Sequence, residues 1–600
     1  MHFPCFLFLS VLLSQVAQES NVTTRTYGLS GLVEWGHWEP TFDLCPRRGS
    51  PAENKGADLD EPDEPDGIFY GDISEVLPEI LGRKGLKDGL VKVELMGARL
   101  VATASDDVHA EIARLVDLID SACLGEERLQ IRVITSEQSL DAPLILDPAE
   151  AERRVSEITS SGKGAVGRAG STSLVDSFVR HIDASDTEAY SKDWGVEIAH
   201  GAVVYDPVWD SRKMGLTASV RAARAKGATY VDIAIRHADT MGPMREEVLE
   251  PRIWMASPGP LEAEHGGLAH GPGGPRKVGV SERVPILVEL PLDRFTSYAG
   301  SFLLPDGKVL WIPFRVVTHA GIVAGALEIR VLGPCRPFFQ LLGGKDDKND
   351  ARCYLLHLGS FLSGGFECPP LSRMAFVALP YLSEWPSRIQ FLHNEAQEVL
   401  AVVKDALPEM ETDESIGASL LSEGHLLLEA PGSMRERVTE RLSTFFKPGR
   451  PFEIEGKVKS GEERLAEFRI PALTGKLSTI WSGLQGSYLA DWDVDVANEA
   501  AVANPEIDSF LDGFALRFLV RTLSNGRIQV TVNGKLSFLE GPPALTDLKN
   551  PYTPSVDKIK ARTLFLDESR YLQDQKDIPV LRFGDERLAL EISLVSLGEG

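Results

Sequence analysis

The sequence contains an internal tandem duplication, and this repeat limits the possible folds more than any other feature of the chain. Residues 190–215 and 488–513 align without a gap at a constant offset of 298 positions. Of these 26 aligned positions 11 are identical, where residue usage would give roughly one or two by chance. We therefore expect two related units in one chain. The identical pairs are Tyr190/Tyr488, Asp193/Asp491, Trp194/Trp492, Val196/Val494, Ala199/Ala497, Ala202/Ala500, Val204/Val502, Pro207/Pro505, Asp210/Asp508, Ser211/Ser509 and Gly215/Gly513.

Looser matches extend the repeat on both sides. Residues 97–119 match 424–445, and each segment reads as a short strand followed by an amphipathic helix. Residues 290–293 match 564–567, so both copies keep one order of elements. We predict an α+β fold with a tandem duplicated module, in which each copy is a small βαββα-type N-domain followed by a β-rich domain.

The length of 600 residues exceeds what one hydrophobic core supports, so several domains are expected. Residues 3–13 form an apolar stretch that is too short to span a bilayer and is followed by small and polar residues, which is typical of a signal peptide. We therefore expect an exported protein, periplasmic or extracellular. The predicted units are a signal peptide at 1–20, an α+β domain at 21–135 with an acidic spacer at 51–67, a β-rich domain at 136–333, a connector with three cysteines at 334–390, a second α+β domain at 391–460 and a second β-rich domain at 461–600.

The charge of the chain narrows the range of partners. The formal net charge is −26 and the isoelectric point is near 5.0. Nucleic acid and anionic lipid both bind clustered Lys and Arg, so we predict no nucleic-acid partner and at most peripheral contact with a membrane. Protein partners or self-association are expected instead.

No segment carries the spacing of a known catalytic or metal-binding motif. The nucleophile elbow, the zinc-protease motif, the phosphate-binding loop and the calcium-binding loop are all missing. His265 and His270 lie beside Glu262 and Glu264 in a Gly-rich loop, but the corresponding loop of the second copy has no histidine. We predict no catalytic, cofactor-binding or metal-binding residues, no cofactor and no enzymatic activity.

Two further groups of residues have more than one interpretation. Cys335, Cys353 and Cys368 lie in one segment and could form a disulfide in an exported protein or remain as buried thiols. Trp194 and Trp492 could contact a ligand, but a Trp beside alternating apolar residues usually anchors a core. We therefore interpret both tryptophans as structural.

Several segments of the first copy resemble the secretin family of type II and type III secretion systems. The segment Tyr27-Gly28-Leu29-Ser30-Gly31-Leu32, residues 97–120 and residues 128–133 resemble the strands and helix of secretin N-domains. Residues 216–237 and 523–536 resemble the paired amphipathic strands of a secretin β-domain. This resemblance implies ring building or partner docking. The gate signature of secretins is only echoed at 577–584, so a pore is not predicted.

The residues and the resemblance together favour a non-enzymatic exported envelope protein that acts in assembly or protein–protein interaction, with a link to a secretion system. One alternative is an extracytoplasmic protein that binds polysaccharide or peptide through its two β-rich units. A divergent hydrolase, with active-site residues brought together only by the fold, is a further alternative.

Overall fold

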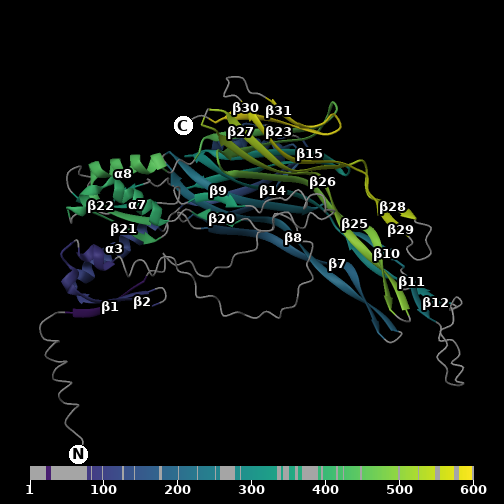
Figure 1. Ribbon diagram of the computed structural model, residues 1–600, viewed down its shortest axis with the longest axis horizontal. Coiled ribbons are helices and arrows are strands. Elements are labelled where there is room, and N and C mark those ends of the chain that lie inside the picture. The colour runs from purple at the N-terminus through teal and green to yellow at the C-terminus, as the bar shows by residue number, and fades with distance from the viewer. Residues whose placement is uncertain are drawn as a thin grey trace, which may run out of the picture.

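The computed structural model describes residues 22–28, 77–123, 127–174, 179–256, 278–333, 339–341, 351–357, 363–367, 390–393, 396–547, 555–572 and 580–597, with short gaps inside several of these ranges. Two large antiparallel sheets form most of this part of the chain (Figure 1). The two small units with helices lie at one end in this view, and the tips of the long hairpins lie at the other.

One of the large sheets has ten strands and contains two very long hairpins. Its strand order is β7-β8-β9-β14-β25-β26-β27-β30, and β11 and β12 continue from the outer part of β26. The strands are β7 (Val179–Ala199), β8 (Ala202–Ala225), β9 (Ala228–Thr240), β14 (Leu292–Pro305), β25 (Leu477–Ala497), β26 (Ala500–Thr522), β27 (Ile528–Leu539), β30 (Ala561–Leu572), β11 (Arg252–Ala256) and β12 (Val278–Arg283).

The other large sheet has nine strands and packs against the first. Its order is β6-β4-β16-β15-β24-β23-β32-β31, and β5 pairs with β15. Residues 128–333 supply its first strands and residues 451–597 its last, so each of these two halves of the chain contributes to both sheets. The strands are β6 (Gly164–Ser173), β4 (Arg128–Ser136), β16 (Gly321–Leu332), β15 (Val309–Thr318), β24 (Glu463–Leu473), β23 (Pro451–Ser460), β32 (Ala589–Ser596), β31 (Val580–Gly584) and β5 (Ile145–Leu146).

A single apolar core fills the space between the two large sheets. The alternation of β23 directs Phe452, Ile454 and Val458 into it, because successive side chains of a strand point to opposite faces. From the other sheet, Phe514 packs 5.1 Å from Phe468, measured between ring centroids. Burying a side chain of this size stabilises the fold by about 1.5–3 kcal/mol, so both halves depend on one shared core.

The predicted α+β fold class is wrong. Most of the described residues belong to the strands of two large antiparallel sheets, and helices are a minor part of the structure. The prediction gave too much weight to the helical periodicity near residues 105–119. The alternation expected of a strand is less clear in the sequence of the long strands, because β8 extends over 24 residues that include Pro207, Gly215 and several charged side chains.

Two small units lie outside the large sheets. In one, β1 (Val22–Gly28), β2 (Leu90–Met96) and β3 (Arg99–Ser105) form a sheet covered by α3 (Asp106–Cys123). Acidic residues begin α3, where the helix dipole favours them, and Val108, Ile112 and Leu115 are buried. The Tyr27 hydroxyl lies 2.7 Å from Nδ1 of the buried His109, which connects β1 to the helix.

The other small unit has a similar order of strands. Its sheet is β17-β18-β22-β21, packed against α7 and α8. Strand β18 comes from the segment predicted as a connector at 334–390, and it pairs along its whole length with β22. The elements are β17 (Phe339–Leu341), β18 (Ala351–His357), α7 (Ala396–Ala406), β21 (Gly417–Ser422), β22 (His425–Pro431) and α8 (Gly432–Phe445), while β19 (Ser363–Glu367) pairs with β20 (Gln390–His393).

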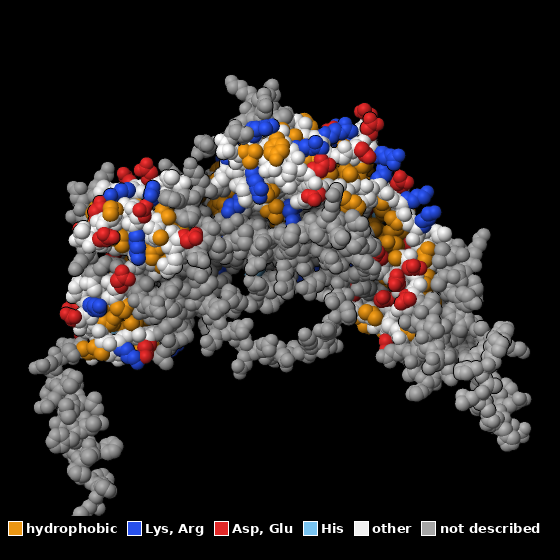
Figure 2. Space-filling model, in the orientation of Figure 1, with side chains coloured by type: hydrophobic (Ala, Val, Ile, Leu, Met, Phe, Trp, Pro, Cys, Tyr) orange, Lys and Arg blue, Asp and Glu red, His pale blue; other side chains and the backbone are white. Residues whose placement is uncertain are grey.

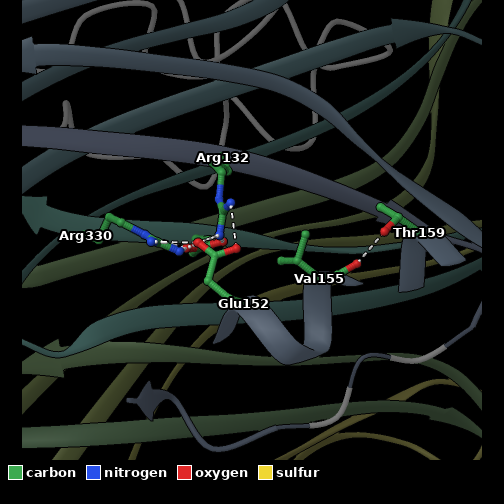
Figure 3. Close-up of polar contacts among 6 residues, drawn as sticks. Arg132, Glu152, Val155, Thr159 and Arg330 are labelled. Atoms are coloured by element: carbon green, nitrogen blue, oxygen red, sulfur yellow. Dashed lines mark hydrogen bonds and ion pairs between the residues drawn. The ribbon is translucent and has the colours of Figure 1, made fainter. Parts of the chain in front are cut away.

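Helix α4 (Pro148–Ser160) covers the nine-stranded sheet in the first half and is held there by a network of charged side chains that runs from the interior to the half-exposed Glu152 (Figure 3). Glu328 on β16 is fully buried and accepts hydrogen bonds from Arg132 at 2.8 Å and from Arg330 at 2.7 Å. Both guanidinium groups also contact Glu152 of α4, at 3.0 and 2.9 Å. Because each charge has an opposite partner, burying them costs far less than burying one alone.

The buried His237 on β9 makes the stability of this fold depend on pH. Burial lowers the pKa of His237 to about 4, whereas an unfolded histidine titrates near 6.5. Between these values the unfolded chain binds the proton more tightly, so stability is lost as pH falls from about 6.5 to about 4. His237→Gln should remove this loss, which amounts to at most about 3 kcal/mol.

Urea unfolding of both proteins at pH 7 and at pH 4.5 measures this difference. Asp293, whose pKa burial raises to about 6, acts with the opposite sign but is present in both proteins and cancels. Equal pH dependence in the wild type and the variant would show that His237 is not the group responsible.

Candidate functional site: the seam between the two halves

The structure gives the two aligned segments the same hairpin. Strands β7 and β8 pair from Val179↔Arg221 to Ala199↔Ala202, and β25 and β26 pair from Leu477↔Leu519 to Ala497↔Ala500. All of these positions differ by 298. The register also shifts at matching places, between Ser191 and Asp193 and between Leu489 and Asp491. The bulges are therefore part of a shared framework, as bulges usually are in related strands.

Identical residues hold each bulged hairpin in shape. The Tyr190 hydroxyl donates to Asp210 at 3.2 Å, and the Tyr488 hydroxyl donates to Asp508 at 3.4 Å. The second oxygen of each carboxylate accepts the backbone N–H of the following serine, at 2.7 and 2.6 Å. These side chains bind the chain itself, which accounts for their identity without a ligand.

The two tryptophans anchor a second layer of short strands on the hairpins. Trp194 donates its indole N–H to the Leu287 carbonyl at 2.8 Å, and Trp492 donates to the Ser555 carbonyl at 2.7 Å. Across each hairpin the tryptophans face Pro207 and Pro505. The layer consists of β10 (Arg245–Leu249) paired with β13 (Ile286–Leu290), and β28 (Ala544–Asp547) paired with β29 (Ser555–Lys558). These contacts agree with the structural role predicted for both residues.

The two halves join strand to strand in the ten-stranded sheet. Strand β14 pairs with β25 from Leu292↔Gly486 to Ala299↔Thr479, which makes the sheet continuous. Phe295 packs edge to face on Trp481 with ring centroids 4.5 Å apart, and Thr296 Oγ1 lies 3.2 Å from Ser482 Oγ. We call this contact, with its counterpart in the other sheet, the seam.

In the nine-stranded sheet the seam is shorter. Strand β15 pairs with β24 through Phe314↔Phe468, Arg315↔Glu467 and Val316↔Ala466. The fully buried Tyr298 of β14 donates its hydroxyl to the Pro471 carbonyl of β24 at 3.3 Å. Both sheets thus cross from one half of the chain to the other at the same place.

Two buried carboxylates in the second half reinforce the seam. Asp512 on β26 is fully buried and accepts from the backbone N–H of His319 at 2.7 Å and from Leu539 N–H at 3.0 Å, while His319 Nδ1 lies 2.6 Å away. Asp557 on β29 accepts from Arg245 of β10 at 2.5 Å and from Leu489 N–H at 2.9 Å. A buried carboxylate with this many donors connects the segments that supply them.

The sequence comparison of the two copies missed these residues. Met214 stands where the first half would have an equivalent of Asp512, because 512 minus 298 is 214. A search for identical residues in the two repeats finds the residues that shape each hairpin. It overlooks a residue that is present in one repeat only because it contacts the other half. For Asp512 the signal is a buried carboxylate that has no counterpart in the other repeat. Asp557 does have a counterpart, Glu289, which accepts the Ser191 N–H at 2.6 Å, and only its bond to Arg245 crosses the seam.

At the outer borders of the two sheets, strands are left with one neighbour. Within the described residues β7 pairs only with β8, β30 only with β27, β6 only with β4 and β31 only with β32. Among the residues that the structure describes, the outer sides of β7 and β30 therefore have no strand partner for their backbone N–H and C=O groups. Such edges are templates for pairing with another chain.

Other sites considered from the sequence fall mainly outside the described residues. His265, His270, Cys335 and Cys368 and the proposed signal peptide lie there. In the part that the structure describes, no group of three or more His, Cys, Asp or Glu side chains is arranged to hold a metal ion. Among the same residues, no helix has the length and apolar character needed to cross a membrane.

Comparison with solved structures gives matches to secretins, all at low identity and low TM-score. The secretin InvG of the Salmonella SPI-1 type III injectisome matches with 8% identity and a TM-score of 0.18, over 42% of this chain and 84% of that chain. The type II secretin GspD from enteropathogenic Escherichia coli gives 7% and 0.14, over 34% and 83%. GspD in an ETEC pilotin–secretin complex gives 8% and 0.12, over 88% and 86%. No family model and no curated protein matches the chain.

Removing the carboxylate of Asp512 tests the seam. In Asp512→Ala, the donors from His319 and Leu539 lose their acceptor inside the protein, so we expect a loss of about 3 kcal/mol in unfolding free energy. Chemical unfolding followed by tryptophan fluorescence measures this loss. The exposed Asp206→Ala on the same sheet should change stability by less than about 0.5 kcal/mol. Equal stability of the two variants would contradict the role given to Asp512.

Proposed function

We propose that this protein is a non-enzymatic, exported component of the cell envelope that works by assembly, with further copies of itself and with other proteins of a secretion system. One observation carries the proposal: the two halves of the chain already associate edge to edge in both sheets. An internal duplication, in which each half corresponds to one assembling unit, accounts for this arrangement.

The outer edges of the chain correspond to the strands that form the seam. Strand β7 occupies in the first half the place that β25 occupies in the second. Strand β30 pairs with β27 in the second half in the same way that β14 pairs with β9 in the first. Each outer border is thus the counterpart of an edge that is paired inside the chain. A head-to-tail contact of this kind repeats, and it closes into a ring or continues as a filament.

The roles of the identical residues support assembly over catalysis. Tyr190, Asp210, Trp194 and their counterparts all bond to the backbone or side chains of their own half. The apolar N-terminal segment supports export, and the sequence resemblance of residues 24–134 to secretin N-domains supports the association with a secretion system.

Measuring the mass of the purified protein over a wide range of concentration tests the proposal. We expect oligomers at high concentration that dissociate on dilution, while the circular dichroism of the β structure stays unchanged. Chemical cross-linking at high concentration should trap a ladder of masses in multiples of the chain. A protein that remains monomeric at every concentration, with no ladder, would contradict assembly as its function.

A further inference from the structure

We infer that β30 of one chain pairs antiparallel with β7 of a second copy, in the register that β14 and β25 use inside each chain. The inference rests on the proposed function and adds to it the strands, the register and the charges of the contact. The partner it requires is a second copy of this chain.

The register follows from the equivalence of the two halves. Gly215 faces Ala238, and its counterpart Gly513 faces Ser537. In the next strand Ala238 faces Phe295, and Ser537 faces Thr563. Phe295 therefore corresponds to Thr563, an offset of 268 (563 minus 295), whereas β7 and β25 differ by 298. At this offset residues 290–293 correspond to 558–561, so the match with 564–567 drawn from the sequence is displaced by six residues.

The two offsets convert the β14–β25 pairs of the seam into the β30–β7 pairs expected between two chains. Inside the chain Phe295 faces Gly483 and Tyr298 faces Ile480. Adding 268 to the first residue of each pair and subtracting 298 from the second places Thr563 opposite Ser185 and Leu566 opposite Ile182. Leu566 and Ile182 are buried and belong to the shared core, as Tyr298 and Ile480 do. The register therefore continues the core from one chain into the next.

This register also places opposite charges face to face. Lys560 comes opposite Glu188, Arg562 opposite Asp186, and Glu568 opposite Arg180. Directly opposed pairs of unlike charge stabilise antiparallel strands. Arg168 already bonds Oδ2 of Asp186, and Arg212 bonds Oε2 of Glu188, yet a carboxylate accepts at both of its oxygens. The border that contains β30 shows Lys and Arg beside Asp and Glu along the top of the molecule (Figure 2).

Registers shifted by two residues keep only one of these unlike pairs each, Arg562 opposite Glu188 in one direction and Lys560 opposite Asp186 in the other. A shift of two residues in one direction places Asp567 opposite Asp183 and Arg570 opposite Arg180, and like charges directly opposite each other destabilise a pair of strands. The opposite shift places the buried Leu566 against Arg180 and Arg562 against Ala184. A slip of one residue turns every side chain to the wrong face.

The contact between chains lacks the buried carboxylate bonds of the seam. Met214 stands in place of Asp512, and Ala544 stands at the position equivalent to Arg245, since Arg245 faces Leu290 and Ala544 faces Lys558. Exposed ion pairs replace these buried bonds. The association between chains is therefore reversible and weakened by salt, whereas the seam within a chain is permanent.

Engineered cysteines read the register directly. Opposed residues of antiparallel strands have Cα atoms about 4.5–5.5 Å apart, which suits a disulfide. Full-length Ser185→Cys/Thr563→Cys should form disulfide-linked ladders on mild oxidation. Thr187→Cys/Thr563→Cys, displaced by two residues, should not, and the three single substitutions and the wild type measure the background from the native cysteines. A ladder from the displaced pair alone would overturn the register.

Reversing charges tests the recognition itself. Lys560→Glu/Arg562→Asp should weaken association about tenfold or more, and adding Asp186→Arg/Glu188→Lys should restore it. Lys404→Glu/Arg437→Asp, a matched pair of exposed residues on α7 and α8, should leave association unchanged. If the charge reversal leaves association unchanged and both cysteine pairs cross-link equally, this inference is overturned while the proposed function stands. A wild-type chain that never associates would overturn both.

Discussion

The pairing of β14 with β25 is the interaction on which the rest of the structure depends. It turns two groups of strands into one sheet, and it brings the core of the first half against the core of the second. Backbone hydrogen bonds carry most of this junction, because several of its positions are small residues such as Gly483, Gly486 and Ser482. A Cβ at Gly483 or Gly486 would collide with neighbouring atoms, so these positions require glycine, whereas the backbone pairing pattern can be repeated at another border of the molecule.

The two halves share framework residues but differ where they meet. Gly215 and Gly513 illustrate the shared part: both have positive φ angles, 117° and 157°, and a Cβ at either position would collide with the backbone of the facing strand. The differences lie in Asp512, His319 and Arg245, which act across the seam. This division explains how a duplicated chain keeps its own halves together permanently while leaving a weaker contact for other copies.

The sequence predicted the equivalence of the hairpins closely, because the identical residues occupy the bulge and the tyrosine–aspartate contact that define the shape of each hairpin. It predicted the fold class wrongly, because the amphipathic period of the α3 segment is strong, whereas β7 and β8 carry charged residues on both faces. The role of β18 was not visible, since a strand in a small sheet gives a short pattern among prolines and glycines. The edges of the sheets could not be predicted, because the periodicity of a segment indicates a strand but does not show which other strands pair with it.

Amide hydrogen exchange, compared between the dissociated and associated protein, tests the central claim most directly. If chains join as the two halves do, exchange should slow on association in β7 and β30, whose outward N–H groups become hydrogen-bonded, while β14 and β25 stay equally protected in both states. Protection that appears only in the small helical units, with β7 and β30 unchanged, would contradict an assembly built by extending the two sheets.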